Sequence, residues 1–467
     1  MNNNSFTSSL LEELTRARTQ IGSQLRAELE SRTVLTPRGD DPDIRIPRER
    51  PRGDRSRLRI GLMADTYLPI RNGVTHMVAL TARILAEWGH EPHIFTFAAP
   101  GAVRASLHGH DGIHVHHAPG LPVLKATYYM PTRYPLRLKR LLRDMDILHV
   151  HHPFISGRLA WRKSSPDQPI VFTNHTRYDM YSHYVHRVVP FLPEDIVEER
   201  LTHRVARFAN RCDAVISPSA SVAGLLHDWG VRAPIETIPN GIVLRRFQEA
   251  KAAATSSHGS TTEFYRSTRA RLGLAPDDLV AVFLGRMAPE KSVDTLLRAF
   301  ALVTPKVPRS TLLLIAAGPL MDEMRALARE LGITDRVRFA GGLPYDEVPD
   351  ALACCDLFVS ASVSEVHPLT FIEAMAAGLA SVGTPSPGVA DTIRDGAGGN
   401  GWLAEATPEC LAAAISEALL NGEERTTRAT QASHDCLQYS IETTVARTLE
   451  LYNRVLDSRV PSTQMNL

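Results

Sequence analysis

Short apolar segments alternate with longer amphipathic ones along most of this chain, and this alternation limits the possible folds more than any other feature. Typical apolar segments are LRIGLMAD at 58–65, DILHVHH at 146–152 and LVAVFLG at 279–285. Each is short, and each is followed by a segment whose apolar residues recur with a helical period. Strands that alternate with helices in this way build a parallel sheet. We therefore predict an α/β protein.

The alternation runs in two series, divided by a small, polar segment at 251–262. A chain of 467 residues is long enough for two or three domains, each with a core of its own. We predict two doubly wound Rossmann-like domains, at 58–245 and 276–425, joined by a linker or loop at 246–275.

The two ends of the chain differ from this pattern. Residues 36–57 are dominated by Arg, Asp and Pro and carry little apolar surface, so 1–57 is expected to be a mobile, largely disordered extension. Residues 426–467 contain a further helical segment after the second sheet is complete. This segment could cap the second domain or cross back to the first, and the sequence favours neither.

The composition excludes several classes of protein. The formal net charge of +1 gives no overall attraction to nucleic acid, and no nucleic-acid partner is predicted. The five cysteines have no CxxC spacing, so neither a disulfide framework nor a cysteine zinc site is encoded. No stretch reaches the ~18 apolar residues of a membrane span, which makes a cytoplasmic protein the default expectation.

Histidines cluster in two of the predicted strands, at 114–117 and 149–152. Neighbouring imidazoles can bind zinc. Because no carboxylate or thiolate stands at the usual ligand spacing from them, we predict no metal site.

Two loops that follow predicted strands carry residues suited to an anion, and ligands of open parallel sheets bind beyond the carboxyl ends of the strands. Gly73 stands directly before a predicted helix, where a residue without Cβ lets an anion approach the helix N-terminus. In the second domain, Arg286 and Lys291 follow a strand and could hold two oxygens of one diphosphate. The alternatives are an ordinary turn glycine and a solvated loop in which Glu290 pairs locally.

A third candidate site is SEVHPLTFIEAMAAG at 364–378, where a strand leads into Glu365 and a following helix carries Glu373. Carboxylates accept hydrogen bonds from hydroxyl groups, and the amides at a helix N-terminus bind phosphate. The segment is therefore suited to a ligand that has both hydroxyls and phosphate. Free backbone N–H groups are expected around the start of the helix, and the candidate ligand-binding residues there are His367, Pro368, Leu369 and Thr370.

Five motifs in one order over 58–403 resemble the family 4 retaining glycosyltransferases of GT-B fold. They are NGV after the first strand, GRMAPEKS, AAGP, the segment at 339–362, and two Glu residues separated by seven others. The resemblance implies two Rossmann-like domains facing a cleft, with the acceptor on the N-terminal side and the nucleotide sugar on the C-terminal side. It also implies catalysis without a metal or other cofactor.

The resemblance assigns roles to the candidate residues. Arg286 and Lys291 would hold the diphosphate of a sugar nucleotide, and Gly73 would approach the phosphates from the opposite domain. Glu373 would bind the ribose hydroxyls, and Glu365 the hydroxyls of the donor sugar.

The segment at 169–185 ends a strand with His175, which matches the family's histidine that contacts donor sugar and acceptor. The residues around it are most similar to the diacylglycerol glucosyltransferase branch. Two departures leave the donor sugar open, since Ser292 stands where the family usually has Gly, and His367-Pro368 replaces an aromatic-Gly pair.

These observations predict a retaining enzyme that moves a hexose, glucose in the first place, from a UDP-hexose to diacylglycerol or a related lipid. A GDP-hexose is the second choice of donor. One alternative is a soluble hydroxyl acceptor. Another, of a different class, is a glycoside hydrolase that uses Glu365 and Glu373 as its carboxylate pair.

The segment at 120–143 is rich in basic residues, tyrosines and leucines and contains no acidic residue. Such a segment fits a peripheral contact with an anionic lipid surface, here the inner face of the cell membrane. The alternative is an amphipathic helix packed on the sheet with a solvated basic face. The candidate membrane or acceptor residues are Arg133, Arg137, Lys139, Arg140 and Arg143.

Overall fold

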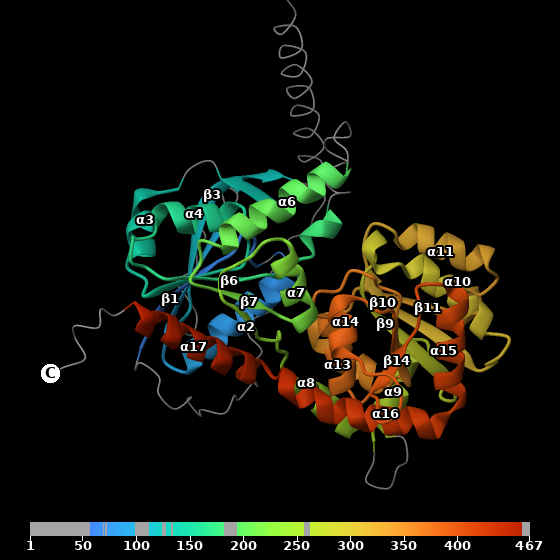
Figure 1. Cartoon of the computed structure of the whole chain (residues 1–467). Helices are drawn as coiled ribbons and strands as arrows, with labels where there is room; N and C mark the ends of the chain where they lie inside the picture. The colour runs from blue at the N-terminus through green and yellow to red at the C-terminus, as the bar shows by residue number, and fades with distance from the viewer. Residues whose placement is uncertain are drawn as a thin grey trace, which may run out of the picture.

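The computed structural model describes residues 57–68, 70, 72–98, 112–123, 128–131, 134–181, 194–255 and 262–459. The predicted extension at 1–57 lies outside the described residues except for Arg57. Two α/β domains stand beside each other, with the blue and green N-terminal domain on one side and the yellow and orange C-terminal domain on the other (Figure 1).

The N-terminal domain is built on an eight-stranded sheet of order β4-β3-β2-β1-β5-β6-β7-β8. All neighbours pair in parallel except β3 and β4, which are antiparallel. The strands are β1 (Arg59–Met63), β2 (Glu91–Ala98), β3 (His114–Val123), β4 (Tyr128–Pro131), β5 (Ile147–Val150), β6 (Ile170–Thr173), β7 (Ala214–Ser217) and β8 (Ile235–Thr237). The helices are α2 (Gly73–Glu87), α3 (Leu136–Arg143), α4 (Ile155–Lys163), α6 (Glu194–Ala209) and α7 (Ala220–Asp228), with a 3₁₀ turn η3 (Tyr178–Tyr181).

The C-terminal domain has a six-stranded parallel sheet of order β11-β10-β9-β12-β13-β14. Its strands are β9 (Leu279–Arg286), β10 (Ser310–Ala317), β11 (Val337–Gly341), β12 (Leu357–Ser360), β13 (Ser381–Gly383) and β14 (Gly401–Leu403). Its helices are α10 (Val293–Val303), α11 (Met321–Glu330), α12 (Val348–Ala353), α13 (Leu369–Ala376), α14 (Pro387–Thr392), α15 (Pro408–Leu420) and α16 (Gly422–Asp435). Short 3₁₀ turns are η4 (Pro289–Lys291), η5 (Thr334–Arg336), η6 (Tyr345–Glu347) and η7 (Cys436–Tyr439).

Both sheets confirm the predicted class of two doubly wound domains. In β9, Ala281 and Phe283 pack into a core on one face of the sheet, and Val280 and Val282 pack into a second core on the other face. A strand buried on both faces reads as a continuous apolar run, which is why the sequence revealed it. The short strands β4 and β14 were not predicted, because neither forms such a run.

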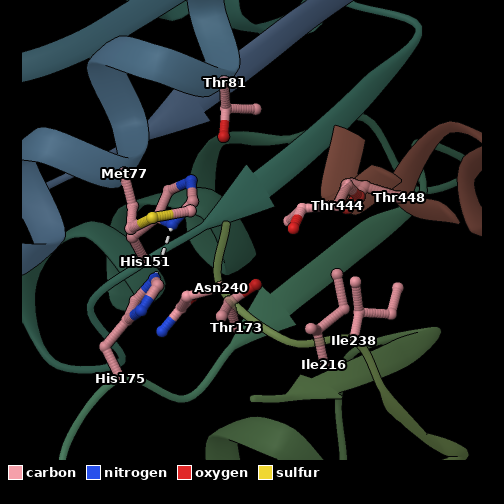
Figure 2. A pocket seen from close by; sticks show the side chains of 10 residues that line it. All are labelled: Met77, Thr81, His151, Thr173, His175, Ile216, Ile238, Asn240, Thr444 and Thr448. Carbon is pink, nitrogen blue, oxygen red and sulfur yellow. Dashed lines mark hydrogen bonds between the residues drawn. The ribbon is translucent and has the colours of Figure 1, made fainter. Parts of the chain in front are cut away.

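The last helix, α17 (Ile441–Ser458), crosses from the C-terminal domain back to the N-terminal one. Val445, Leu449 and Tyr452 are buried in the same core as residues of β1 and α2. Figure 1 shows α17 in red along the N-terminal domain, and Figure 2 shows that its Thr444 and Thr448 line a small pocket together with residues of that domain. In the described part of the chain, no helix combines the length and the apolar character needed to cross a membrane.

The sequence predicted a linker or loop at 246–275. The structure corrects this prediction, because the region contains two helices, α8 (Leu244–Ala254) and α9 (Glu263–Arg271). The small residues suggested a loop, but Ala250 and Ala254 are small because they pack closely against Ala353 and Cys354. Phe247 of α8 is fully buried in the C-terminal core, so the helix belongs to that domain.

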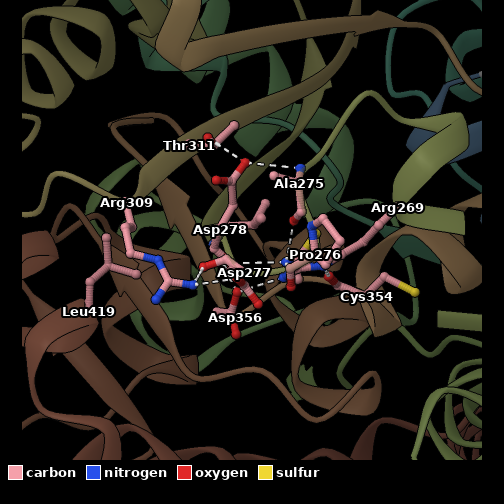
Figure 3. Close-up of polar contacts among 12 residues, drawn as sticks. Arg269, Ala275, Pro276, Asp277, Asp278, Arg309, Thr311, Cys354, Asp356 and Leu419 are labelled. Carbon is pink, nitrogen blue, oxygen red and sulfur yellow. Dashed lines mark hydrogen bonds and ion pairs between the residues drawn. The ribbon is translucent and has the colours of Figure 1, made fainter. Parts of the chain in front are cut away.

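Arg269 of α9 anchors this helix pair to the C-terminal sheet, and its side chain is only 2% exposed. Its Nε donates to the carbonyl of Cys354 at 2.9 Å, and one terminal nitrogen pairs with Asp356 at 2.9 Å (Figure 3). The other terminal nitrogen donates to the carbonyls of Ala275, Pro276 and Asp278. Every nitrogen of the guanidinium is thus hydrogen-bonded, as a buried charge requires.

Candidate active site

Lys291 and Glu365 form an ion pair that joins the loop after β9 to the loop after β12. The ammonium nitrogen of Lys291 lies 2.6 Å from Oε1 of Glu365, and the two side chains are 23% and 14% exposed. Burial opposes ionisation of Glu365, but the charge and hydrogen bond of Lys291 outweigh it and hold the pKa of that carboxyl below its usual value. The structure therefore brings together two of the predicted site residues, both charged.

The turn that presents Lys291 is conformationally unusual. Ser292 has φ 47° and ψ 44°, and it is the single non-glycine residue with positive φ in the described ranges. This left-handed conformation costs an L-residue roughly 1–2 kcal/mol and lets the chain pass from η4 directly into α10. The hydroxyls of Ser362 and Ser364 donate to the carbonyl of Glu290 and fix the turn against the neighbouring loop.

Arg286, the other predicted diphosphate ligand, pairs with Glu290 four residues later. Its side chain is 58% exposed. The local pairing that the sequence left open as an alternative is therefore present, and the role of Arg286 at a diphosphate stays a prediction.

Glu373 lies on α13, which begins at Leu369, and its exposed fraction is 5%. Tyr345 of η6 donates its hydroxyl to Oε1 of Glu373 at 3.0 Å. Burial raises the pKa of Glu373 to about 7, and the hydrogen bond from Tyr345 opposes this rise. The Glu373 carboxyl therefore gains or loses its proton near neutral pH, whereas Glu365 is held ionised.

The start of α13 has no side-chain cap, since Pro368 occupies the N-cap position. His367 and Pro368 are buried, and Leu369 and Thr370 are half-buried. The His367 ring packs edge-on against Tyr439 at 5.4 Å, and burial lowers its pKa to about 4. His367 therefore supports the loop as a neutral side chain.

Gly73 is the first residue of α2 and is exposed. The preceding Asn72 caps the helix reciprocally with Thr75, each accepting a hydrogen bond from the other's backbone N–H at 2.9 Å. A Cβ built on Gly73 would meet no atom within 4 Å. Open space at a helix N-terminus fits the predicted approach of an anion.

His175 follows β6 and is half-buried. Its Nε2 lies 2.9 Å from Nδ1 of His151, the first residue after β5 (Figure 2). Burial, with smaller effects from His152 and His149, lowers the pKa of His175 to about 3, so the ring is neutral at physiological pH. The pocket beside these rings has a volume of about 20 Å³, room for water and too little for a sugar.

Two contacts join the N-terminal domain to the C-terminal domain, one from α2 and one from α7. The His76 ring of α2 packs against the Tyr345 ring of the C-terminal domain, with 4.7 Å between centroids. Ser221 of α7 donates its backbone N–H and its hydroxyl to the two carboxylate oxygens of Asp391 on α14, at 2.8 and 2.7 Å. The faces of the two domains that carry α2 and η6 therefore touch in this structure.

The basic residues predicted to contact a membrane lie on α3, away from the candidate active site. Arg137, Arg140 and Arg143 are exposed on α3, Lys139 is half-buried, and Arg133 lies outside the described residues. Leu138 and Leu142 of the same helix are buried, while Leu136 is 71% exposed. Figure 1 shows α3 on the side of the N-terminal domain away from the C-terminal domain.

Several contributors were missed by the sequence reasoning. Tyr345, Ser362 and Ser364 give no local signal, because their partners are 28 to 74 residues away in the chain. Gly388 packs so closely that a Cβ would lie 2.4 Å from the carbonyl of Val366.

Within the described ranges, no cluster of three or more His, Cys, Asp or Glu side chains is arranged to hold a metal ion.

Comparison with known domain families decides the class of protein. Residues 71–246 match the domain described as Glycosyltransferase Family 4, and residues 265–435 match the domain described as Glycosyl transferases group 1. The chain belongs to the GT-B glycosyltransferases. This confirms the family resemblance and removes the glycoside hydrolase alternative.

Curated relatives of this glycosyltransferase differ in their acceptors. It is 28% identical over 370 residues to alpha-monoglucosyldiacylglycerol synthase of Streptococcus pneumoniae, covering 78% of each chain. The synthase of the same name from Acholeplasma laidlawii is 26% identical, over 69% of this chain and 79% of that protein. D-inositol 3-phosphate glycosyltransferase of Nocardia farcinica is 28% identical, over 70% and 72%.

Solved structures confirm the fold of the glycosyltransferase. Anabaena HepE in complex with UDP has a TM-score of 0.65 at 19% identity, covering 85% of this chain and all of that one. Sucrose-phosphate synthase from Thermosynechococcus elongatus has a TM-score of 0.67 at 20% identity, covering 86% and 100%. At these identities the likeness concerns the fold.

Proposed function

We propose that the enzyme transfers glucose from UDP-glucose to a hydroxyl of diacylglycerol or a related lipid, with retention of the anomeric configuration. The observation that carries the proposal is the half-buried pair of Lys291 and Glu365 beside the start of α13. One cation and one carboxylate side by side suit a donor that has phosphate next to sugar hydroxyls.

Lys291 is proposed to stabilise the charge that grows on the diphosphate as the sugar departs. A fixed ammonium group in a partly buried site lowers the barrier because it needs no reorganisation during the reaction. Arg286 would exchange Glu290 for a phosphate oxygen when the donor binds. Gly73 would admit the phosphates to the N-terminus of α2 from the other domain.

Glu365 is proposed to accept hydrogen bonds from the hydroxyls of the donor sugar, and Glu373 from the ribose. Glu365 is held ionised by Lys291, so it is a hydrogen-bond acceptor only. The neutral His175 would orient sugar and acceptor. The proton of the acceptor hydroxyl would pass to the departing phosphate oxygen on the same face of the sugar, which accounts for retention.

The proposed lipid acceptor is supported by the two diacylglycerol synthases among the relatives and by helix α3. Its exposed arginines stand beside the exposed Leu136, a combination that favours an anionic lipid surface. Each cation near such a surface contributes roughly 1 kcal/mol.

A soluble acceptor is the second candidate, and the inositol phosphate glycosyltransferase among the relatives supports it. The experiment offers purified protein UDP- and GDP-hexoses with anionic vesicles containing diacylglycerol, or with inositol phosphate in solution. Products are identified by mass. A glucosylated lipid formed from UDP-glucose supports the proposal, and a product only from the soluble acceptor contradicts the lipid assignment.

A further inference from the structure

Tyr345 stands between the two domains and touches both a candidate ligand-binding carboxylate and the opposite domain. Its hydroxyl donates to Oε1 of Glu373 at 3.0 Å, and its ring packs against His76 with 4.7 Å between centroids. Tyr345 lies within the segment at 339–362 that contributes to the family resemblance, and that resemblance assigns it no role. The residue is half-buried in the short turn η6, which directly precedes α12.

We propose that Tyr345 is a positioning residue for the nucleotide, whose hydroxyl fixes the carboxylate of Glu373 for the ribose while its ring ties that carboxylate to the opposite domain. The inference rests on the proposed role of Glu373 at a ribose.

The Glu373 carboxylate can accept the hydrogen bond from Tyr345 and bind ribose hydroxyls at the same time. An ionised carboxylate has about four acceptor positions on two oxygens. Tyr345 uses one on Oε1, and among the described residues no side chain or backbone group donates to Oε2. Two ribose hydroxyls can therefore bind while the tyrosine hydrogen bond persists. That bond fixes one oxygen and so determines the direction of the other.

The elements packed against α13 include α8, α16 and η7, which carry further charged and titratable groups. Arg246 of α8 pairs with Asp346 at 3.2 Å, and the stem of Lys251 lies over Gly378 at the far end of α13. Asp435 at the end of α16 pairs with Arg394 at 2.6 Å. In η7, the Tyr439 ring packs on His367. From the opposite domain, His76 faces the Tyr345 ring.

The ionisation of Glu373 provides a readout that a purely structural tyrosine would not change. Burial raises the pKa of Glu373 to about 7, and the Tyr345 hydrogen bond lowers it. Ribose hydroxyls donate to the ionised form, so UDP should bind more tightly as pH rises through 7. Removing the tyrosine hydroxyl raises the pKa further and moves this transition to higher pH.

The test measures UDP binding by calorimetry between pH 6 and 8.5 for wild type and Tyr345→Phe, which keeps the ring. We expect about tenfold weaker binding at pH 7, the usual effect of losing a hydrogen bond to a charged group, and a midpoint at higher pH. The UDP phosphates titrate equally with both proteins, so the difference between the curves reports on Glu373. The control is Tyr265→Phe in α9, which removes the hydroxyl of a tyrosine whose ring packs against Arg269.

Two further experiments separate the role of the Tyr345 hydroxyl from the role of its ring. In a Glu373→Gln background, Tyr345→Phe should no longer shift the pH midpoint. Tyr345→Ala and His76→Ala should be non-additive in UDP binding if the rings act through their contact.

Equal or tighter UDP binding by Tyr345→Phe, or an unmoved midpoint, overturns the inference. If wild type binds neither UDP nor GDP at any of these pH values, the proposed function itself fails, which is a distinct result.

Discussion

Nδ1 of His151 and Nε2 of His175 lie 2.9 Å apart, so one of these two rings must donate a hydrogen bond to the other. Nε2 of His151 is buried and has no hydrogen-bond partner among the described residues. A buried N–H without an acceptor is rarer than an unused lone pair, which assigns the His151 proton to Nδ1. His175 then accepts at Nε2 and carries its own proton on Nδ1.

The first prediction is that neutral His175 is the Nδ1–H tautomer. Nitrogen-15 NMR of histidine-labelled protein at pH 7 measures this directly. His151→Leu should shift the tautomer equilibrium and lower kcat for transfer roughly five- to tenfold, the effect of one neutral hydrogen bond. A His175 ring protonated at Nε2 in wild type would contradict the assignment.

Strain at Ser292 gives the second prediction. Its positive φ should make Ser292→Gly more stable by up to about 1 kcal/mol, while Ser292→Val should lose about 1–2 kcal/mol because a β-branched residue avoids this conformation. Urea unfolding of the C-terminal domain measures both changes. Equal stabilities of the Gly and Val variants would show that the turn is not strained.

The third prediction concerns the contribution of Arg269 to the free energy of unfolding. Arg269→Ala removes the partner of Asp356 and of four carbonyls, and we expect a loss of about 3–5 kcal/mol in the free energy of unfolding. The control is Arg266→Ala on the same helix, whose exposed pair with Glu263 is worth at most ~1 kcal/mol. Similar losses for both variants would contradict the anchoring role.

Much of this architecture could be predicted because strands of a doubly wound sheet are buried on both faces and appear as continuous apolar runs. Lys291 and Glu365 could be located for a related reason, since each follows such a run. The contacts of Tyr345 and the ring pair of His151 and His175 could not be predicted, because they join residues distant in sequence. Helix α8 was missed because alanines that pack closely resemble a small-residue loop.

The fourth prediction concerns the basic helix α3. Replacing Arg137 and Arg140 by Gln should weaken binding to phosphatidylglycerol vesicles by about 2 kcal/mol, or roughly thirtyfold, and leave UDP binding unchanged. Lys306→Gln with Arg329→Gln, two exposed cations of the C-terminal domain, is the matched control. Vesicle sedimentation measures both pairs, and equal losses would assign vesicle binding to net charge instead of α3.

The proposed function depends on Lys291, and its replacement provides the most direct test. Glucosyl transfer from UDP-glucose is measured for wild type and Lys291→Ala, with thermal unfolding as the check on folding. We predict that turnover falls by about 10²-fold or more, as expected when a group that stabilises transition-state charge is removed. Unchanged turnover in a folded Lys291→Ala protein would contradict the proposal that this ammonium group stabilises the departing diphosphate.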